Sequence, residues 1–264
     1  MKQWRTGRFF IANSASRGVL LALAYSSAVL LAWHVAVVVG DIKPFVLPKP
    51  SSVLRSLYTL PTYYARHFLV TGYEALAGLA VGFLGGVGLG LLIRYCGRLG
   101  RLVQPLVVAS QVFPKEALAP LLVVYIGFGP GSKITVSALI CFFPAVINTV
   151  QGLRAAPEAY ERLLHTLGAT RLQRFWNVHL PYAASYILAA LRMSAAFSVV
   201  GAVVGEFVGA SAGLGHVIRA ANADIGVDRV YAALLLLGVL GGALYGGALL
   251  LENVVFRRFT TITD

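Results

Sequence analysis

Six apolar blocks, each about twenty residues long, constrain the fold of this chain more than any other feature. They cover roughly residues 19–40, 72–93, 102–128, 132–150, 182–209 and 231–251. A helix of about twenty apolar residues crosses the hydrocarbon core of a bilayer and satisfies its own backbone hydrogen bonds there. The runs are continuous and do not alternate, so a membrane β-barrel is excluded. The sequence therefore predicts an all-α integral membrane protein with six transmembrane helices.

The formal charge of +12 suggests a nucleic-acid partner at first sight, but its distribution argues against one. With the N-terminus inside, thirteen lysines and arginines fall in cytoplasmic segments and seven, including Lys133, fall outside. This excess follows the positive-inside rule and predicts that both termini are cytoplasmic. The lipid bilayer is the expected partner of these charges, and no nucleic acid is expected.

The chain carries no recognisable catalytic, nucleotide or metal motif. GFGPGSK, which ends at Lys133, lacks the glycine before lysine and the serine or threonine after it that a phosphate-binding loop requires. Cys96 and Cys141 cannot pair across this topology, and two cysteines are too few for a metal cluster, so we interpret both as structural. The five histidines are scattered, which argues against a zinc site. We expect no enzyme activity and no cofactor in this chain.

Glycines recur every fourth residue in three of the blocks, at positions 78–90, 201–209 and 238–246. Such spacing places small residues on one helix face, where two helix backbones can approach closely in lipid. Packing within one subunit and packing at a dimer seam both remain open.

The third block is interrupted by Pro114-Lys115-Glu116 and again by Pro120. Proline in mid-helix removes a hydrogen bond, and charge at membrane depth is a functional-site hypothesis by default. Glu206, near the outer end of the fifth block, is another charge at membrane depth. We expect its carboxylate to be partly hydrated there. The predicted substrate path therefore comprises Phe113, Lys115, Glu116 and Glu206. Pairing with a neighbouring helix, or a hydrogen bond to backbone for Glu206, is the structural alternative.

Two other features are local. In the outer segment 41–66, Pro44, Pro48 and Pro50 predict extended chain, after which Ser51 or Ser52 caps a short amphipathic helix. In the fifth block, Arg192 lies about three turns from Pro181, and its long side chain is expected to reach cytoplasmic water.

The polar, basic loop 151–181 lies between the fourth and fifth blocks. Pro157-Glu158 favours a helix start, Gly168 a turn, and Thr170 the cap of a second short helix. Leu180-Pro181 is expected to stop the loop and begin the next span. Two short helices at an angle would form a rigid knob suited to transmitting force to a partner.

The segment GLRAAPEAYERLLHTLGATRLQRFWNVHLP resembles the EAA loop of ABC importer permeases, whose frame is Glu-Ala-Ala, three residues, Gly, nine residues, Ile/Val, one residue, Leu-Pro. Gly168, Val178, Leu180 and Pro181 match in register. The segments LPKPSSVLRSL, PKEALAPLLVVYIGFGPGSK, FFPAVINTVQGLR and GEFVGASAGLGHVI resemble the nitrate/sulfonate/taurine branch, over about residues 45 to 258. One departure is that Arg162 occupies the position of the family's Glu, with Glu161 displaced by one.

The resemblance implies a type I permease fold, with a first helix and external segment at 1–63, a five-helix core at 64–251 and a C-terminal tail at 252–264. It implies that the loop couples to an ATPase through a set of ten residues: Glu158, Glu161, Arg162, Gly168, Ala169, Thr170, Arg171, Val178, Leu180 and Pro181.

The implied partners are a second copy of this chain, two ATP-binding cassette subunits that hold ATP and Mg²⁺, and an external substrate-binding protein. The resemblance also implies a location in the bacterial inner membrane and the transport of a small, often anionic solute. The alternative from another class is an ion- or proton-coupled secondary transporter. Against it, the six blocks show no clear inverted repeat.

Overall fold

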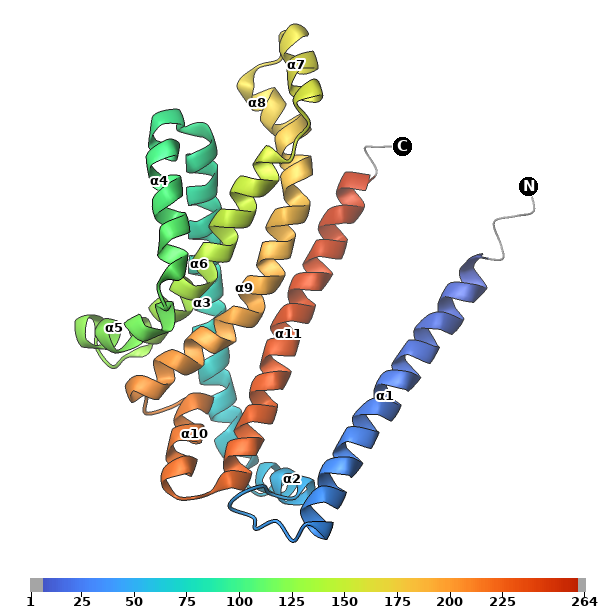
Figure 1. The fold of residues 1–264 in the computed structure, drawn as a ribbon, viewed down its shortest axis with the longest axis vertical. Helices are drawn as coiled ribbons and strands as arrows, with labels where there is room; N and C mark the ends of the chain where they lie inside the picture. Colours follow the sequence, from blue (N-terminus) through green and yellow to red (C-terminus); the bar gives the residue numbers. More distant parts are fainter. Residues whose placement is uncertain (1–6, 261–264) are drawn as a thin grey trace. The chain divides into compact units, whose positions relative to one another are not determined.

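The structure, a computed structural model, describes residues 7–260, and these form helices and short connections without a strand (Figure 1). The elements in order are α1 (Gly7–Val39), α2 (Pro50–Thr59), α3 (Pro61–Tyr95), α4 (Gly97–Ala109), η1 (Ser110–Val112), η2 (Lys115–Leu118), α5 (Ala119–Ile126), α6 (Pro130–Arg154), α7 (Glu158–Thr166), α8 (Arg171–Arg174), η3 (Phe175–His179), α9 (Leu180–Gly209), α10 (Leu214–Ala223) and α11 (Val227–Thr260).

Among the described residues, four helices are long and apolar enough to cross a bilayer: Pro61–Tyr95, Pro130–Arg154, Arg171–Gly209 and Val227–Val254. Gly100–Val112 and Lys115–Ile126 form a fifth candidate, a pair bent by 88° at the predicted interruption. The first predicted span appears as the shorter apolar stretch Ala24–Val39 within α1. The all-α membrane class is confirmed, whereas the count of six full spans is not reproduced as such.

The chain divides into two compact units. The first comprises the chain up to Pro61 together with Ala221–Ala232. In it Trp33 packs on Tyr231 with ring centroids 5.5 Å apart. The short amphipathic helix predicted in the outer segment is α2, but the predicted serine cap is wrong. Pro50 occupies the first turn, so Lys49 is the N-cap and Ser52 Oγ donates to the Lys49 carbonyl oxygen at 2.8 Å.

The second unit comprises Thr62–Ala220 and the chain from Ala233 onward, and α6 runs between α3 and α9 within it (Figure 1). Two of the three glycine ladders explain this packing. A Cβ at any of Gly78, Gly82, Gly86 and Gly90 would collide with α6, and so would a Cβ at Gly201 or Gly205. The absence of side chains at these positions lets three helices pack backbone to backbone.

Polar side chains reinforce the contact between α6 and α9. Ser137 Oγ donates to the Ser198 carbonyl oxygen at 2.9 Å, and Ser194 Oγ donates to the Cys141 carbonyl oxygen at 3.1 Å. Cys141 is fully buried, and its thiol donates to the Ser194 carbonyl oxygen at 3.2 Å. Because these bonds satisfy polar atoms inside the bundle, Cys141 fits the structural role predicted for it.

The third series of glycines, on α11, does not pack against another helix of this unit. A Cβ at Gly238, Gly242 or Gly246 would meet nothing within 4 Å. Within this unit Leu240 of the same helix, α11, packs with Ala75 and Val199 on its other side. Arg192, whose side chain is 30% exposed, forms an ion pair with Glu252 of α11 at 3.1 Å.

Candidate functional site

The predicted knob is present as α7, a turn and α8. Gly168 turns the chain with a φ of +77°, a conformation that favours glycine. Thr170 caps α8 as predicted: Gln173 N donates to Thr170 Oγ1 at 3.3 Å, and Thr170 N donates to Gln173 Oε1 at 2.8 Å. This reciprocal pair is a capping box and fixes the start of α8.

The boundary predicted at Leu180-Pro181 is wrong, because α8, η3 and α9 form one helix from Arg171 to Gly209. The π-helical turn η3 directly precedes Pro181, which lies in the first turn of α9. The shifted hydrogen bonds of a π-turn accommodate a residue without an N–H. The knob is consequently continuous with the membrane helix α9.

The acidic residues of α7 face two ways. Glu161 turns toward its own chain, where its carboxylate lies 3.9 Å from Arg94, 4.0 Å from Arg174 and 3.6 Å from His179. A polar cavity of about 260 Å³ surrounds this group. Glu161 thereby ties the knob to the end of α3.

Glu158 and Arg162 lie on the surface of the same helix. They form an i,i+4 pair at 3.7 Å, and their side chains are 86% and 79% exposed. Exposed pairs of this kind contribute little to stability, so both charges are available to a partner. Arg162, the residue that departs from the family pattern, is thus more accessible than Glu161.

Apolar side chains also lie exposed on the knob. Leu163 is 55% exposed, Leu167 72%, Leu172 66% and Trp176 58%. Ala169 and Arg171 continue the turn and α8, whereas Val178 is buried at the root of the knob. A polar segment that presents several large apolar groups is typical of an interaction surface.

The break between α4 and α5 holds three of the four residues of the predicted substrate path. Phe113 is 68% exposed, and Glu116 is also exposed. The Lys115 amine lies 4.6 Å from the centroid of the Phe143 ring on α6. A cation over an aromatic face is stabilised by the ring quadrupole, so Lys115 has a partner within the chain.

Glu206, the fourth residue of that path, lies in a different environment and is fully buried rather than partly hydrated. Thr71 Oγ1 of α3 donates to Glu206 Oε1 at 2.6 Å, and the Gly215 backbone N–H donates to Oε2. Leu214 N donates to Thr71 Oγ1 at 2.7 Å. These bonds hold the first turn of α10 against α3 and α9.

Two charged residues that lie beside Glu206 in the structure were not predicted as site residues from the sequence. Lys133, counted among the outer charges, is only 2% exposed, and Glu74 is 3% exposed. The Lys133 amine donates to the carbonyl oxygens of Phe128 and Gly129. A single acid inside the apolar run 72–93 was a signal that could have found Glu74, because ionisable residues at membrane depth are rare and costly.

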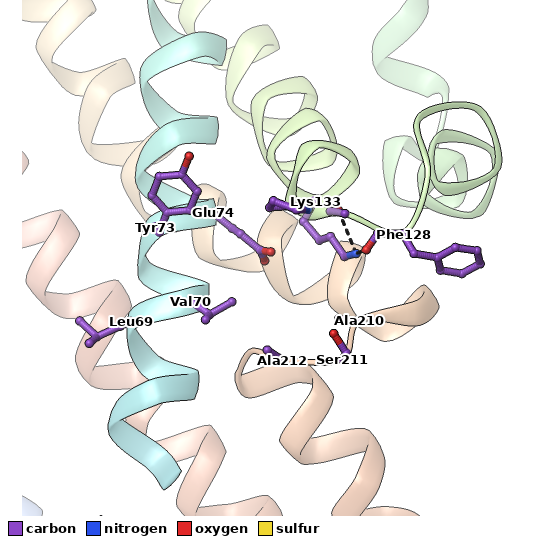
Figure 2. A pocket seen from close by; sticks show the side chains of 11 residues that line it. Leu69, Val70, Tyr73, Glu74, Phe128, Lys133, Ala210, Ser211 and Ala212 are labelled. Atoms are coloured by element: carbon purple, nitrogen blue, oxygen red, sulfur yellow. Dashed lines mark hydrogen bonds between the residues drawn. The ribbon is translucent and has the colours of Figure 1, made fainter. Parts of the chain in front are cut away.

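A cavity of about 450 Å³ opens beside Glu74 and Lys133 (Figure 2). Its walls come from three places: residues 69–74 of α3, the segment from Phe128 to Lys133, and the loop 210–212. Figure 2 shows Glu74 pointing from α3 toward α6, the Lys133 amine extending from α6 to the Phe128 carbonyl oxygen, and the Phe128 ring pointing away. The cavity lies where α6 begins and α9 ends, whereas α6 ends and the Arg171–Gly209 helix begins at the knob.

Comparison with known proteins places these features in a family context. Residues 79–261 match the family described as "Binding-protein-dependent transport system inner membrane component". A "Probable ABC transporter permease protein" of Haemophilus influenzae is 36% identical over 227 residues, 86% of this chain and 93% of the relative.

The names of several relatives state a solute. The formylaminopyrimidine transport permease protein ThiX of Halalkalibacterium halodurans is 35% identical over 214 residues, 81% of this chain and 86% of the relative. The taurine transport system permease protein TauC of Escherichia coli is 27% identical over 252 residues, 93% of this chain and 90% of the relative.

The fold is similar to that in an inward-facing structure of the MetNI methionine ABC transporter. The TM-score is 0.63 at 20% identity, and the match covers 75% of this chain and 98% of that one.

Proposed function

Because the chain belongs to the family of binding-protein-dependent transport system inner membrane components, it is the permease subunit of an ABC importer, and we propose that two copies of it form the solute path. The family pairs such subunits with an ATPase and an external binding protein, and ATP hydrolysis takes place in the separate ATPase subunit. In our proposal two ATPase subunits hold ATP and Mg²⁺, and this chain binds neither. Its termini are cytoplasmic, in a bacterial inner membrane.

The observation that carries the proposal is the single helix from Arg171 to Gly209. Its 39 residues span roughly 58 Å at 1.5 Å per residue. One end carries the knob that docks the ATPase, and the other end carries Glu206. A displacement of the knob during ATP hydrolysis would therefore move the far end of α9 without passing through a flexible joint.

The coupling surface that we propose keeps the ten residues inferred from the sequence and divides them by role. Glu158 and Arg162 face the ATPase. Glu161, Val178, Leu180 and Pro181 hold the knob to the membrane helices. Gly168, Ala169, Thr170 and Arg171 form the turn and the start of α8.

The substrate path in this proposal includes Phe113, Lys115 and Glu116 in the α4–α5 break, with Glu206 near the outer end of α9. The solute is small. Relatives support several solute classes, among them sulfonates such as taurine, nitrogen heterocycles such as formylaminopyrimidine, and choline. The ion- or proton-coupled transporter considered from sequence has no support among the relatives, which are ABC permeases.

Copurification tests the docking surface. Leu167→Asp places a charge on the exposed apolar part of the knob, and Tyr58→Asp does the same at an 87% exposed residue of α2. Loss of one well-placed apolar contact costs about 1–2 kcal/mol or more, so we expect about tenfold less ATPase subunit per permease with Leu167→Asp. Tyr58→Asp should retain the wild-type ratio. Equal retention in both variants would contradict the docking assignment.

A further inference from the structure

The cavity beside Glu74 contains a hydrogen-bond acceptor that the chain leaves free. Glu74 is 3% exposed, lines the cavity, and has no hydrogen-bond partner for Oε2 among the described residues. An unsatisfied carboxylate oxygen in a site with little water is costly, so a ligand that donates a hydrogen bond there gains more than it would in water.

The neighbouring charges are already occupied. The Lys133 amine donates to two carbonyl oxygens, those of Phe128 and Gly129. Both oxygens of Glu206 accept hydrogen bonds, from Thr71 Oγ1 and the Gly215 backbone. The Glu74 carboxyl group also shares a hydrogen bond with Glu206, so Oε2 is the Glu74 oxygen that is left without a partner.

The walls of the cavity fit a compact, largely apolar ligand. Leu69 and Val70 line it together with two alanines of the loop 210–212. A cavity of about 450 Å³ lies within the range of small-molecule sites, in which apolar walls bind the body of a ligand and a few polar groups orient it.

The position of the cavity is suitable for a site that receives the solute from outside the membrane. The knob lies at one end of the α6–α9 pair and the cavity lies at the other end (Figure 1). If the knob meets the ATPase in the cytoplasm, the cavity lies in the external half of the membrane, where a binding protein releases its solute. This step rests on the proposed function.

We infer that this cavity binds the transported solute through an N–H group, either a protonated amine or the N–H of a nitrogen heterocycle, donated to Glu74 Oε2. The same arrangement selects against sulfonates and other anions, because the lysine in the cavity already donates to backbone oxygens while a carboxylate faces the ligand. Glu74 thereby acts as a specificity residue, and the solute class shifts from the anion expected from sequence to an N–H donor.

Titration of three probes tests this inference on the full chain copurified with its ATPase subunit in lipid nanodiscs. The probes are 2-aminopyrimidine, which donates N–H bonds, pyrimidine, which has the same ring without a donor, and methanesulfonate. Saturation-transfer NMR measures the Kd of each. We expect 2-aminopyrimidine to bind wild-type protein about tenfold or more tightly than pyrimidine, because its N–H pairs a buried oxygen that otherwise stays unsatisfied, and methanesulfonate to bind most weakly.

Glu74→Leu removes the acceptor at similar volume and should weaken 2-aminopyrimidine about 10- to 100-fold. Asp224→Asn, at an exposed carboxylate paired with Arg229 and outside the cavity lining, should leave the Kd unchanged. Wild-type affinity in Glu74→Leu overturns the inference. If that variant fails to assemble, the wild-type panel decides: equal binding of the two rings, or tighter binding of methanesulfonate, also overturns it. The ATP hydrolysis rate of the same preparation reports on the proposed function separately.

Discussion

Replacing Gly86 by alanine should weaken the contact between α3 and α6, whereas the same change at Gly88 should not. A Cβ at Gly86 would lie 2.6 Å from Ala145 Cβ and 3.2 Å from Val146 N, while a Cβ at Gly88 would meet nothing within 4 Å. Carbon atoms pack best at about 3.5–4.0 Å, so the helices must separate by roughly 1 Å to admit the methyl group. Overpacking of this kind costs about 1–3 kcal/mol.

The measurement is the free energy of unfolding in mixed micelles, titrated with dodecyl sulfate. A loss of about 1–3 kcal/mol corresponds to a change of about 5- to 150-fold in the unfolding equilibrium. Since both changes are from glycine to alanine in one helix, two residues apart, the gain in helix propensity is common to both and cancels in the comparison. Equal stability of the two variants would refute the close approach of α3 and α6. It would also refute the interpretation that the glycines at positions 78–90 allow these helices to pack closely.

Three further changes test the knob and the topology. At Gly168, Asn should retain coupled ATP hydrolysis better than Val, because Asn tolerates a positive φ and a β-branched residue does not; equal activities would show that the turn conformation is unimportant. Glu161→Gln should lower the thermal stability of the complex more than Glu158→Gln, since only Glu161 faces three basic groups of its own chain; the reverse order would contradict the two orientations. In a background without native cysteines, a single cysteine at Ser51 should react with an impermeant maleimide from outside and one at Thr170 only after the cytoplasmic face is opened; the opposite pattern would invert the orientation.

Local chemistry explains the parts of the fold that the sequence predicts well. The length of the apolar blocks sets the spans, and the knob follows from neighbouring residues alone: Gly168 supplies the positive φ, and Thr170 with Gln173 forms the cap. The helix boundaries that were predicted wrongly also have local causes. Pro50 shifts the start of α2 by taking the first turn, and the π-turn before Pro181 lets a helix continue where a stop was expected.

The buried charges depend instead on contacts between distant segments. Glu74 and Lys133 lie on different helices, and Lys133 looks like an outer-loop charge until the backbone of Phe128 and Gly129 is seen to bind its amine. Glu206 was found as an isolated acid, but its partners, Thr71 and the Gly215 backbone, come from α3 and from the first turn of α10. Such pairings follow from how α3, α6 and α9 pack and not from spacing along the chain.

Uptake into proteoliposomes tests the central claim, that this chain moves a solute only when a partner ATPase drives it through the knob. The complex is reconstituted with its binding protein outside, ATP is enclosed inside, and labelled solute is counted with and without ionophores. We expect uptake that requires ATP, survives the collapse of ion gradients, and falls about tenfold when Leu167→Asp weakens ATPase binding. Uptake that proceeds without ATP and stops with an ionophore would contradict it.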